Sequence, residues 1–283
     1  MQNSVQIAPL RPNDIEAAFR LTYNEGWNQT RSDWLRLLRH QPKGCFGAYS
    51  EDRLVGTVTT SVYGEDLAWV GMMLVQREYR GRGIGRRLMI AALEYAQTEV
   101  STIKLDATPA GRTLYQALGF VPEAGIERWE KGGTPPEADP NPITIEKLKV
   151  AEICKIDLVA FGADRARMLE LLSQQSCVAP LVASNQDGSA CGYAMARPGS
   201  RATHLGPIVS IDPHQTFALF DQMIGQFERA IYVDLYKGSA TASNFLSAKG
   251  FAKQRDLTRM YWGKPSCAGL SPYIFSIAGP EIG

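Results

Sequence analysis

A stretch rich in proline and glycine near the middle of the chain sets its domain organisation. The sequence GGTPPEADPNP, residues 132–142, cannot continue a helix or a central strand, because proline lacks the backbone N–H that both need. The chain has 283 residues, which exceeds the usual size of a single hydrophobic core. We therefore predict two domains, residues 1–131 and 143–263, joined by this linker and followed by a tail, residues 264–283.

The predicted elements follow the same order on both sides of the linker. Each half reads as a strand, helices, a hairpin, a buried strand, a helix, a strand, a short helix and a last strand. The hairpins turn at residues 51–53 and at Asp187-Gly188, and Gly-Phe precedes the last strand at residues 119–120 and 250–251. We interpret the halves as two copies of one α/β unit with few identical residues.

Helix boundaries in the first half are predicted from capping patterns and apolar periodicity. Asn13 with Glu16, and Thr30 with Asp33, have the spacing of a capping box, so we expect helices to begin at about Asn13 and at Thr30. Apolar residues recur at helical spacing over residues 86–100, which predicts a further helix.

The composition argues against several functional classes. The formal net charge is +1, so the chain has no general basic field for nucleic acid or an anionic membrane surface. The five cysteines form no Cys-x-x-Cys pair, and we expect reduced thiols in a cytoplasmic protein without a metal site. We find no signal-peptide pattern and no apolar run of about 18 residues, so we expect no membrane segment.

A loop of arginines and glycines follows the buried strand of residues 67–75. The stretch REYRGRGIGRRLM, residues 77–89, leads directly into a helix. Glycines let successive backbone N–H groups converge on one point and let a ligand approach the main chain closely. The first N–H groups of a helix lack partners within it, and the helix dipole favours an anion there. The loop is therefore predicted to bind an anion, more specifically a pyrophosphate, rather than to be only a solvated surface loop.

Two common nucleotide motifs do not fit this loop. A Walker loop ends in Gly-Lys-Ser/Thr, and a dinucleotide fingerprint needs G-x-G-x-x-G after a first strand. The loop instead resembles the acyl-CoA signature of the GNAT superfamily of N-acyltransferases, R/Q-x-x-G-x-G/A, with Arg80, Gly83 and Gly85 at the defined positions. LDATPAGRTLYQALGF, residues 105–120, resembles a later strand–helix–strand element of the same superfamily.

The resemblance implies a fold and a cosubstrate. The fold is α/β, with a central, mostly antiparallel sheet in each half that contains a splayed strand pair and is flanked by helices. Acetyl-CoA is the implied cosubstrate, and no metal is implied. The backbone of Met73, Leu74 and Val75 would pair with the pantetheine arm. The pyrophosphate would lie on the loop residues Arg80, Gly81, Arg82, Gly83, Ile84, Gly85 and Arg86.

Acyl transfer to an amine needs a base for the amine, a donor for the oxyanion and an acid for the departing thiolate. The resemblance implies Tyr115 as the acid and a backbone N–H of residues 73–75 as the oxyanion donor. For the base the sequence offers Glu65, Asp66 or an ordered water. The amine would attack the thioester directly, so the prediction is an acetyl-CoA-dependent N-acetyltransferase that acts through a ternary complex.

The second half keeps the order of elements but loses these residues. Asp212 and Pro213 begin the helix that corresponds to the one after the arginine loop; the carboxylate would repel a diphosphate, and proline lacks one N–H. Leu246 stands where the first half has its tyrosine. We predict that this half binds no CoA. It would cover the first domain or wall its acceptor pocket, with His204 or Arg197.

Two other classes of function remain open. One is a CoA-sensing binding module in which Tyr115 is only structural, and the other is a scaffold that acts through the second domain. Turnover with acetyl-CoA and a panel of amines separates them, because a sensor binds CoA and releases no thiol. The acceptor would be a small-molecule or peptide amine. Its identity, the acyl-chain preference and the oligomeric state, including a homodimer, are not determined by the sequence.

Overall fold

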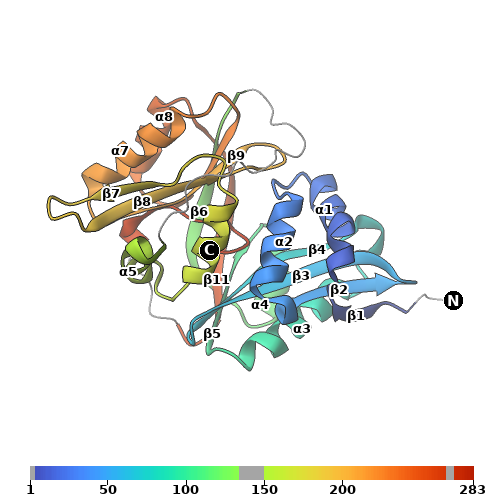
Figure 1. Ribbon diagram of the computed structural model, residues 1–283. Helices are drawn as coiled ribbons and strands as arrows, with labels where there is room; N and C mark the ends of the chain where they lie inside the picture. The colour runs from blue at the N-terminus through green and yellow to red at the C-terminus, as the bar shows by residue number, and fades with distance from the viewer. Residues whose placement is uncertain (1–3, 134–149, 266–270) are drawn as a thin grey trace.

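The computed structural model describes residues 4–133, 150–265 and 271–283 (Figure 1). Most of the predicted linker, and the strand predicted just after it, lie outside the described residues. The strands of the first half are β1 (Gln6–Pro9), β2 (Cys45–Ser50), β3 (Arg53–Tyr63), β4 (Leu67–Val75), β5 (Thr102–Ala107) and β6 (Val121–Lys131). Its α-helices are α1 (Ile15–Asn24), α2 (Arg31–His40), α3 (Ile84–Gln97) and α4 (Arg112–Ala117).

The second half repeats this order. Its strands are β7 (Leu181–Ser184), β8 (Ala190–Arg197), β9 (Thr203–Ser210), β10 (Ile231–Tyr236), β11 (Ala252–Gly263) and β12 (Ile274–Ser276). Its α-helices are α5 (Val150–Phe161), α6 (Ala166–Gln174), α7 (Pro213–Ile224) and α8 (Ala240–Ala248). Short 3-10 turns are formed by Pro12–Asp14, Pro42–Gly44, Arg77–Tyr79 and Ser271–Tyr273. None of the helices in these ranges has both the length and the apolar composition of a membrane span.

The two predicted capping boxes have different outcomes. The box at Thr30 is confirmed, because the Thr30 N–H donates to the Asp33 carboxylate at 2.7 Å and the Asp33 N–H donates to the Thr30 hydroxyl at 3.3 Å. The box at Asn13 is wrong. Proline with its fixed φ favours the start of a helical turn, and here it opens the 3-10 turn Pro12–Asp14, so α1 begins only after that turn.

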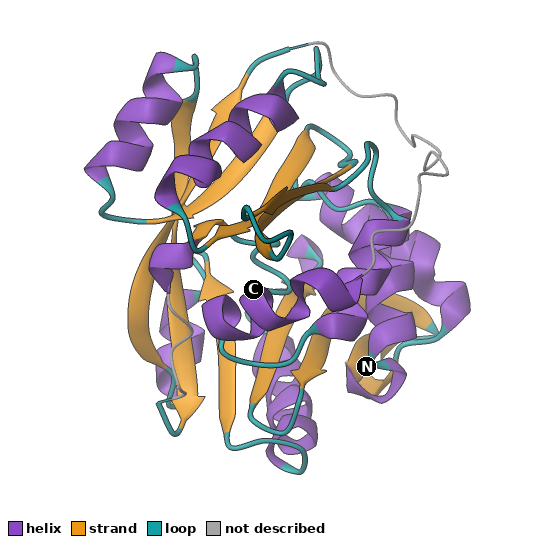
Figure 2. Cartoon of the chain, turned by 60° about the vertical axis from the view of Figure 1, so that its left-hand side comes forward, coloured by secondary structure: helices purple, strands orange, loops and turns teal. Residues whose placement is uncertain are grey.

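Twelve strands among the described residues form one continuous sheet. Their order is β1-β2-β3-β4-β5-β11-β6-β10-β9-β8-β7, with β12 paired to β9. The halves exchange strands at the centre, because β11 of the second half lies between β5 and β6 of the first, and β6 pairs in turn with β10 (Figures 1 and 2). The predicted α/β fold with a central sheet in each half is confirmed, and the two sheets are joined into one.

Two buried ion pairs hold the exchanged strands in register. Arg128 on β6 lies opposite Asp234 on β10, and Arg259 on β11 lies opposite Asp106 on β5. Each guanidinium donates two hydrogen bonds to its carboxylate, at 2.8 and 2.6 Å in the first pair and at 2.9 Å twice in the second. All four side chains are at most 4% exposed. Removing one partner of such a pair costs about 3–5 kcal/mol, so these contacts tie the halves together.

Hydrophobic clusters cover both faces of the sheet in each half. In the first half α1 and α2 pack on one face and α3 packs on the opposite face. In the second half α7 and α8 share a cluster that includes Phe220 and Leu246. The cluster under α1 and α2 continues into α5 and α6, so the hydrophobic core also crosses between the halves.

The tail after β12 returns to the middle of the molecule, where Figure 1 marks the C-terminus. Ile277 and Ile282 are at most 1% exposed. Trp69 donates its indole N–H to the Pro280 carbonyl at 3.0 Å. A Cβ on Gly71 of β4 would lie 2.4 Å from the Glu281 carbonyl oxygen, so only glycine admits the tail at this place. The sequence pattern makes no prediction for this segment.

Candidate active site

The first half contains the splayed strand pair. The parallel strands β4 and β5 pair only between residues 67–69 and 102–104, and they diverge beyond Trp69. Along the diverging stretch β4 also has a bulge against β3, and Met72 there has a φ of 50°, which is rare for a residue with a side chain. One edge of β4 therefore faces an opening instead of a neighbouring strand.

A cleft of about 460 Å³ occupies this opening. It is lined by most of the residues predicted to bind the cofactor: Met73, Leu74, Val75, Arg80, Gly81, Gly83, Ile84 and Gly85. Tyr115 on α4 lies at the same cleft. Of the predicted set, Arg82 and Arg86 are exposed residues of the loop and the first helical turn that do not line the cleft.

The glycine loop ends in an uncapped helix. Helix α3 begins at Ile84, two residues before the predicted start, and its N-cap is Gly83 with a φ of 74°. No side chain caps this end, and the first turn holds no acidic residue. Gly81 also has a positive φ, of 76°, and a Cβ at either glycine would meet nothing within 4 Å. The backbone conformation therefore favours glycine here, and the first N–H groups of α3 are placed to receive an anion.

The arginines of the loop have different surroundings. The Nε of Arg80 donates to the Val75 carbonyl at 2.8 Å, and its Nη2 pairs with Glu25 at 2.8 Å. This fixes Arg80 against the end of β4 and offsets part of its charge. Arg82 donates to a backbone carbonyl of the preceding turn at 2.9 Å, and its side chain, like that of Arg86, is exposed. The positive charge around the loop is thus greatest on its solvent side.

Tyr115 is buried beside the inner end of the cleft. Its side chain is 8% exposed, and its ring lies edge-to-face with Phe120 at 6.0 Å between centroids. Burial raises the pKa of Tyr115 to about 12, so its phenol stays protonated at neutral pH. Its hydroxyl makes no hydrogen bond to another described residue. This hydroxyl is therefore available as a donor to a group that enters the cleft.

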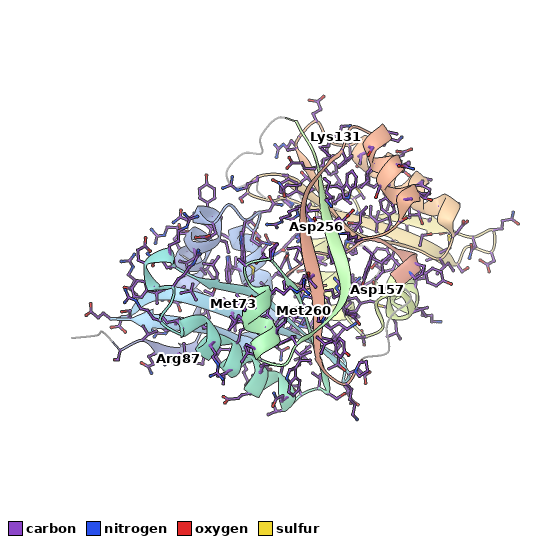
Figure 3. All side chains as sticks on the ribbon, turned by 180° about the vertical axis from the view of Figure 1, so that it is seen from behind. Met73, Arg87, Lys131, Asp157, Asp256 and Met260 are labelled. Carbon is purple, nitrogen blue, oxygen red and sulfur yellow. The ribbon has the colours of Figure 1, made fainter. Side chains whose placement is uncertain are left out.

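A second, smaller pocket of about 80 Å³ adjoins the cleft. The two share Trp27, Met73, Thr108 and Tyr115, so they meet at one place. Figure 3 labels Met73 in the first half and Met260 on β11, and β5 lies between β4 and β11 in the sheet. The far wall of the small pocket comes from elements late in the sequence: Arg255 and Leu257 of β11, and Pro280 and Glu281 of the tail.

His204 and Arg197, the residues predicted to wall this pocket, lie behind its wall. The Nη2 of Arg197 pairs with the Glu281 carboxylate at 2.6 Å. The His204 Nε2 lies 3.3 Å from the Ile277 carbonyl, which can only accept, so this nitrogen carries the proton. Burial and the charge of Arg197 lower the pKa of His204 to about 3 and keep the ring neutral. Both residues therefore hold the tail that forms the wall.

The two carboxylates suggested as the base are not brought to the site. Glu65 and Asp66 are exposed in the turn that opens β4, while Met73 lies near the other end of that strand. At about 3.3 Å per strand residue, Glu65 is roughly 25 Å from Met73. The carboxylates that line the small pocket are instead Asp106 and Glu281.

Sequence reasoning missed the pocket residues that come from loops and from the second half. Trp27 and Gln29 follow α1 without any motif, and Glu281 lies in a tail without a periodic pattern. A signal did exist for the central ion pairs. Arg128 and Arg259 lie eight residues after the Phe of the two Gly-Phe pairs, so alignment of the repeats would have shown them as equivalent.

At the equivalent opening in the second half, the chain itself pairs with the free strand edge. Strands β9 and β10 pair only at residues 203–204 and 231–232 before they diverge. Beyond that point β12 pairs with β9, with Ile274 opposite Val209. Helix α7 begins at Pro213, as predicted, and Leu246 is fully buried on α8. A hollow of about 520 Å³ remains, with residues 272–275 in its wall.

Comparison with known families finds the same kind of domain in both halves. Residues 12–120 match the family described as "Acetyltransferase (GNAT) family". Residues 153–276 match the family described as "Acetyltransferase (GNAT) domain". The two matches are consecutive and do not overlap.

Relatives of similar length align with nearly the whole chain. An uncharacterized N-acetyltransferase, YitH, of Bacillus subtilis (strain 168) is 24% identical over 92% of each chain. Holothin acyltransferase of a Pseudoalteromonas species (strain SANK 73390) is 26% identical over 92% of this chain and 88% of the relative. The structure of a putative acetyltransferase from Pyrococcus horikoshii superposes with a TM-score of 0.80, at 24% identity, over 100% of this chain and 97% of that one.

Proposed function

Because the chain consists of two GNAT domains in tandem, we propose that it is an N-acetyltransferase that transfers an acetyl group from acetyl-CoA directly to an amine. The active site is the opening between β4 and β5 of the first half. One observation carries this proposal most strongly: the cleft runs from the uncapped start of α3 to the buried hydroxyl of Tyr115.

The donor fits the cleft in one orientation. The pyrophosphate lies on the N–H groups of Gly81 to Arg86, where the helix dipole and the surrounding arginines favour negative charge. Hydrogen bonds to a charged group contribute about 1.5–3 kcal/mol each, so several of them anchor the donor. The pantetheine arm then follows the free edge of β4 at residues 73–75, and the thioester reaches the junction with the small pocket.

The reaction forms a C–N bond and breaks a C–S bond. The neutral amine attacks the thioester carbonyl, and a backbone N–H of residues 73–75 donates to the oxyanion. The nitrogen then loses a proton to water, because Glu65 and Asp66 are distant and both nearby carboxylates are held by arginines. The sulfur leaves as a thiolate that accepts a hydrogen bond from Tyr115, and it ends as a thiol once protonated.

The pKa of Tyr115 decides how this last step proceeds. With a phenol at about 12 and a thiol near 8.5, full proton transfer from Tyr115 to the thiolate is uphill by about 5 kcal/mol. The hydroxyl therefore acts as a hydrogen-bond donor during C–S cleavage, and solvent supplies the proton afterwards.

The second half binds no CoA in this proposal. β12 occupies the edge of β9 that corresponds to the pantetheine edge of β4, and the helix at Pro213 follows no glycine loop. Calorimetric titration of the whole chain with acetyl-CoA should give one equivalent bound per chain. A second site of comparable affinity would contradict this assignment.

Turnover tests the proposal as a whole. Incubation with acetyl-CoA and a panel of amines should release free thiol only when an amine is present, with an acetylated amine detected by mass spectrometry. Binding of acetyl-CoA without thiol release for any amine would favour the alternative of a CoA-sensing module.

A further inference from the structure

The small pocket contains a guanidinium without a partner. Arg255 lines this pocket from β11, which crosses from the second half near Asp256 to the first half at Met260 (Figure 3). Among the described residues the side chain of Arg255 has no ion-pair or hydrogen-bond partner, and its Nε is buried. Burial and the neighbouring Arg128 lower the pKa of Arg255 to about 10, so it is still a cation at neutral pH. Burying an unpaired guanidinium costs free energy unless a bound ligand supplies a negative charge to pair with it.

The other arginines around the pocket are already paired. Arg259 binds Asp106, and Arg128 binds Asp234. The Glu281 carboxylate is bound by Arg197 at 2.6 Å. Asp234 and Glu281 also act on Arg255 by charge, but neither is within bonding distance of it. Arg255 is thus the positive charge at this pocket that the described residues leave unpaired.

The same pocket contains an unpaired acceptor. Gln29 is 9% exposed, and its Nε2 donates to the Glu281 carboxylate at 3.1 Å. This bond fixes the amide orientation, because a carboxylate oxygen accepts and does not donate. The Oε1 of Gln29 is consequently buried without a partner. It can accept an N–H from a molecule that enters the pocket.

We propose that the acceptor is a small amino acid-like molecule, whose carboxylate binds Arg255 and whose amine donates to the Oε1 of Gln29. This inference rests on the proposed function, because the pocket opens to the thioester beside Met73 and Tyr115. The cavity of about 80 Å³ has room for several water molecules, which matches a small zwitterion. The ammonium group of the zwitterion first loses one proton to water, and the neutral nitrogen attacks the thioester. As the C–N bond forms and the C–S bond breaks, the nitrogen loses a second proton to water and the CoA thiolate takes up a proton from solvent, while the carboxylate stays bound to Arg255.

Pairs of amines that differ only in the presence of a carboxylate test this proposal. The probes are the twenty common amino acids and the amines that their decarboxylation gives, each assayed for thiol release from acetyl-CoA. In the best pair, kcat/KM should be at least tenfold higher for the amino acid. The variant Arg255→Met, which keeps an apolar stem, should bring this ratio close to one, and Arg255→Lys should restore part of it. The matched control Lys253→Met removes a cation from the same strand outside the pocket and should keep the wild-type ratio.

A binding measurement separates this inference from the proposed function. The enzyme saturated with CoA is titrated calorimetrically with the same amino acids, and Arg255→Met should weaken binding at least tenfold. Amino acid binding through Arg255 without any turnover would support the carboxylate site and contradict the transferase. Equal turnover of both members of every pair, or an unchanged ratio in Arg255→Met, would overturn the carboxylate site and leave the transferase standing. Failure of every amino acid both to react and to bind would also overturn the site.

Discussion

The same two strands diverge in both halves, and only in the second half does a further strand of the chain pair with the edge that the divergence frees. In the first half β4 and β5 diverge after three paired residues, and a cleft follows. In the second half β9 and β10 diverge after two, and β12 pairs with the free edge of β9. A repeated fold therefore supplies the opening twice, and the residues around it decide whether a ligand or the chain occupies it.

The tail contacts the two halves at equivalent positions. Trp69 is the last residue of β4 paired with β5, and its indole N–H donates to the Pro280 carbonyl. His204 is the last residue of β9 paired with β10, and its ring N–H donates to the Ile277 carbonyl. The comparison shows that the tail is held twice by similar hydrogen bonds, once beside the opening of each half.

The largest effect should come from removing the Tyr115 hydroxyl, because the second half has Leu246 at the equivalent position. Tyr115→Phe removes the hydrogen bond to the departing thiolate, so kcat should fall about 100-fold or more, while acetyl-CoA affinity stays within twofold. The matched change in the second half, Leu246→Met, conserves volume and should leave kcat unchanged. A loss below threefold in Tyr115→Phe, with chemistry shown to limit turnover, would make Tyr115 a packing residue.

The next largest effect concerns acid stability, because His204 titrates and its counterpart Trp69 does not. The pKa of His204 is about 3 in the folded protein and about 6.5 when unfolded, so the unfolded state binds the proton first as the pH falls. Stability is therefore complete above about pH 6.5 and is lost towards pH 3, by about 2 kcal/mol at pH 5.

His204→Gln keeps an N–H for the Ile277 carbonyl and removes this titration. The difference in free energy of unfolding between pH 7 and pH 5, from urea titrations, should shrink by about 2 kcal/mol relative to the unmutated protein. His40, whose pKa is lowered to about 4 by burial, contributes a similar loss in both proteins. An identical pH dependence in both proteins would show that His204 is not neutralised by folding.

A smaller effect is expected when the glycine loop is compared with a turn of the second half. Gly83 and Gly188 both have positive φ, 74° and 82°, with nothing within 4 Å of a Cβ. A valine at either position strains the backbone to a similar extent. Only Gly83→Val should raise the Kd of acetyl-CoA, by about tenfold, because it disturbs the start of α3. Equal affinities of the two variants by calorimetry would argue against the pyrophosphate assignment.

The smallest effect on ligand binding should come from moving the tail. The methyl group in Gly71→Ala would meet the Glu281 carbonyl, and in Gly206→Ala it would meet the Ile277 carbonyl at 2.2 Å. Both variants should lose stability, by about 1–3 kcal/mol. Gly71→Ala alone should also raise the acceptor KM, by about threefold, since the tail walls the small pocket, the proposed acceptor site, only there. The same KM change in both variants would mean that the tail moves as one piece.

Patterns among neighbouring residues correctly predicted the strands that such patterns determine. The strands at residues 45–50, 67–75 and 231–236 are found as predicted, because β-rich runs between polar turns determine them. The loop at residues 80–86 was predicted from its own glycines and arginines. The base at Glu65 or Asp66 was assigned by closeness in sequence to the site strand, and a strand of nine residues separates its two ends.

The lining of the small pocket could not be predicted because its residues meet only after the strands are exchanged. Gln29 and Glu281 are 252 residues apart and share a hydrogen bond. Neither has a neighbour in sequence that marks it, and the pairing of β11 with β5 that brings Arg255 close has no local pattern. The ion pairs of Arg128 and Arg259 follow the repeat, and only a comparison of the halves reveals them.

The exchange of β11 has a consequence for how the molecule is assembled. About 145 residues separate the end of β5, at Ala107, from the start of its partner β11, at Ala252. During synthesis the first half must therefore wait, with an edge of β5 unpaired, until most of the second half has been made. Such distant pairing is slow and exposes strand edges to other chains. We expect the halves to fold as one cooperative unit, with the first half completed last although its sequence comes first.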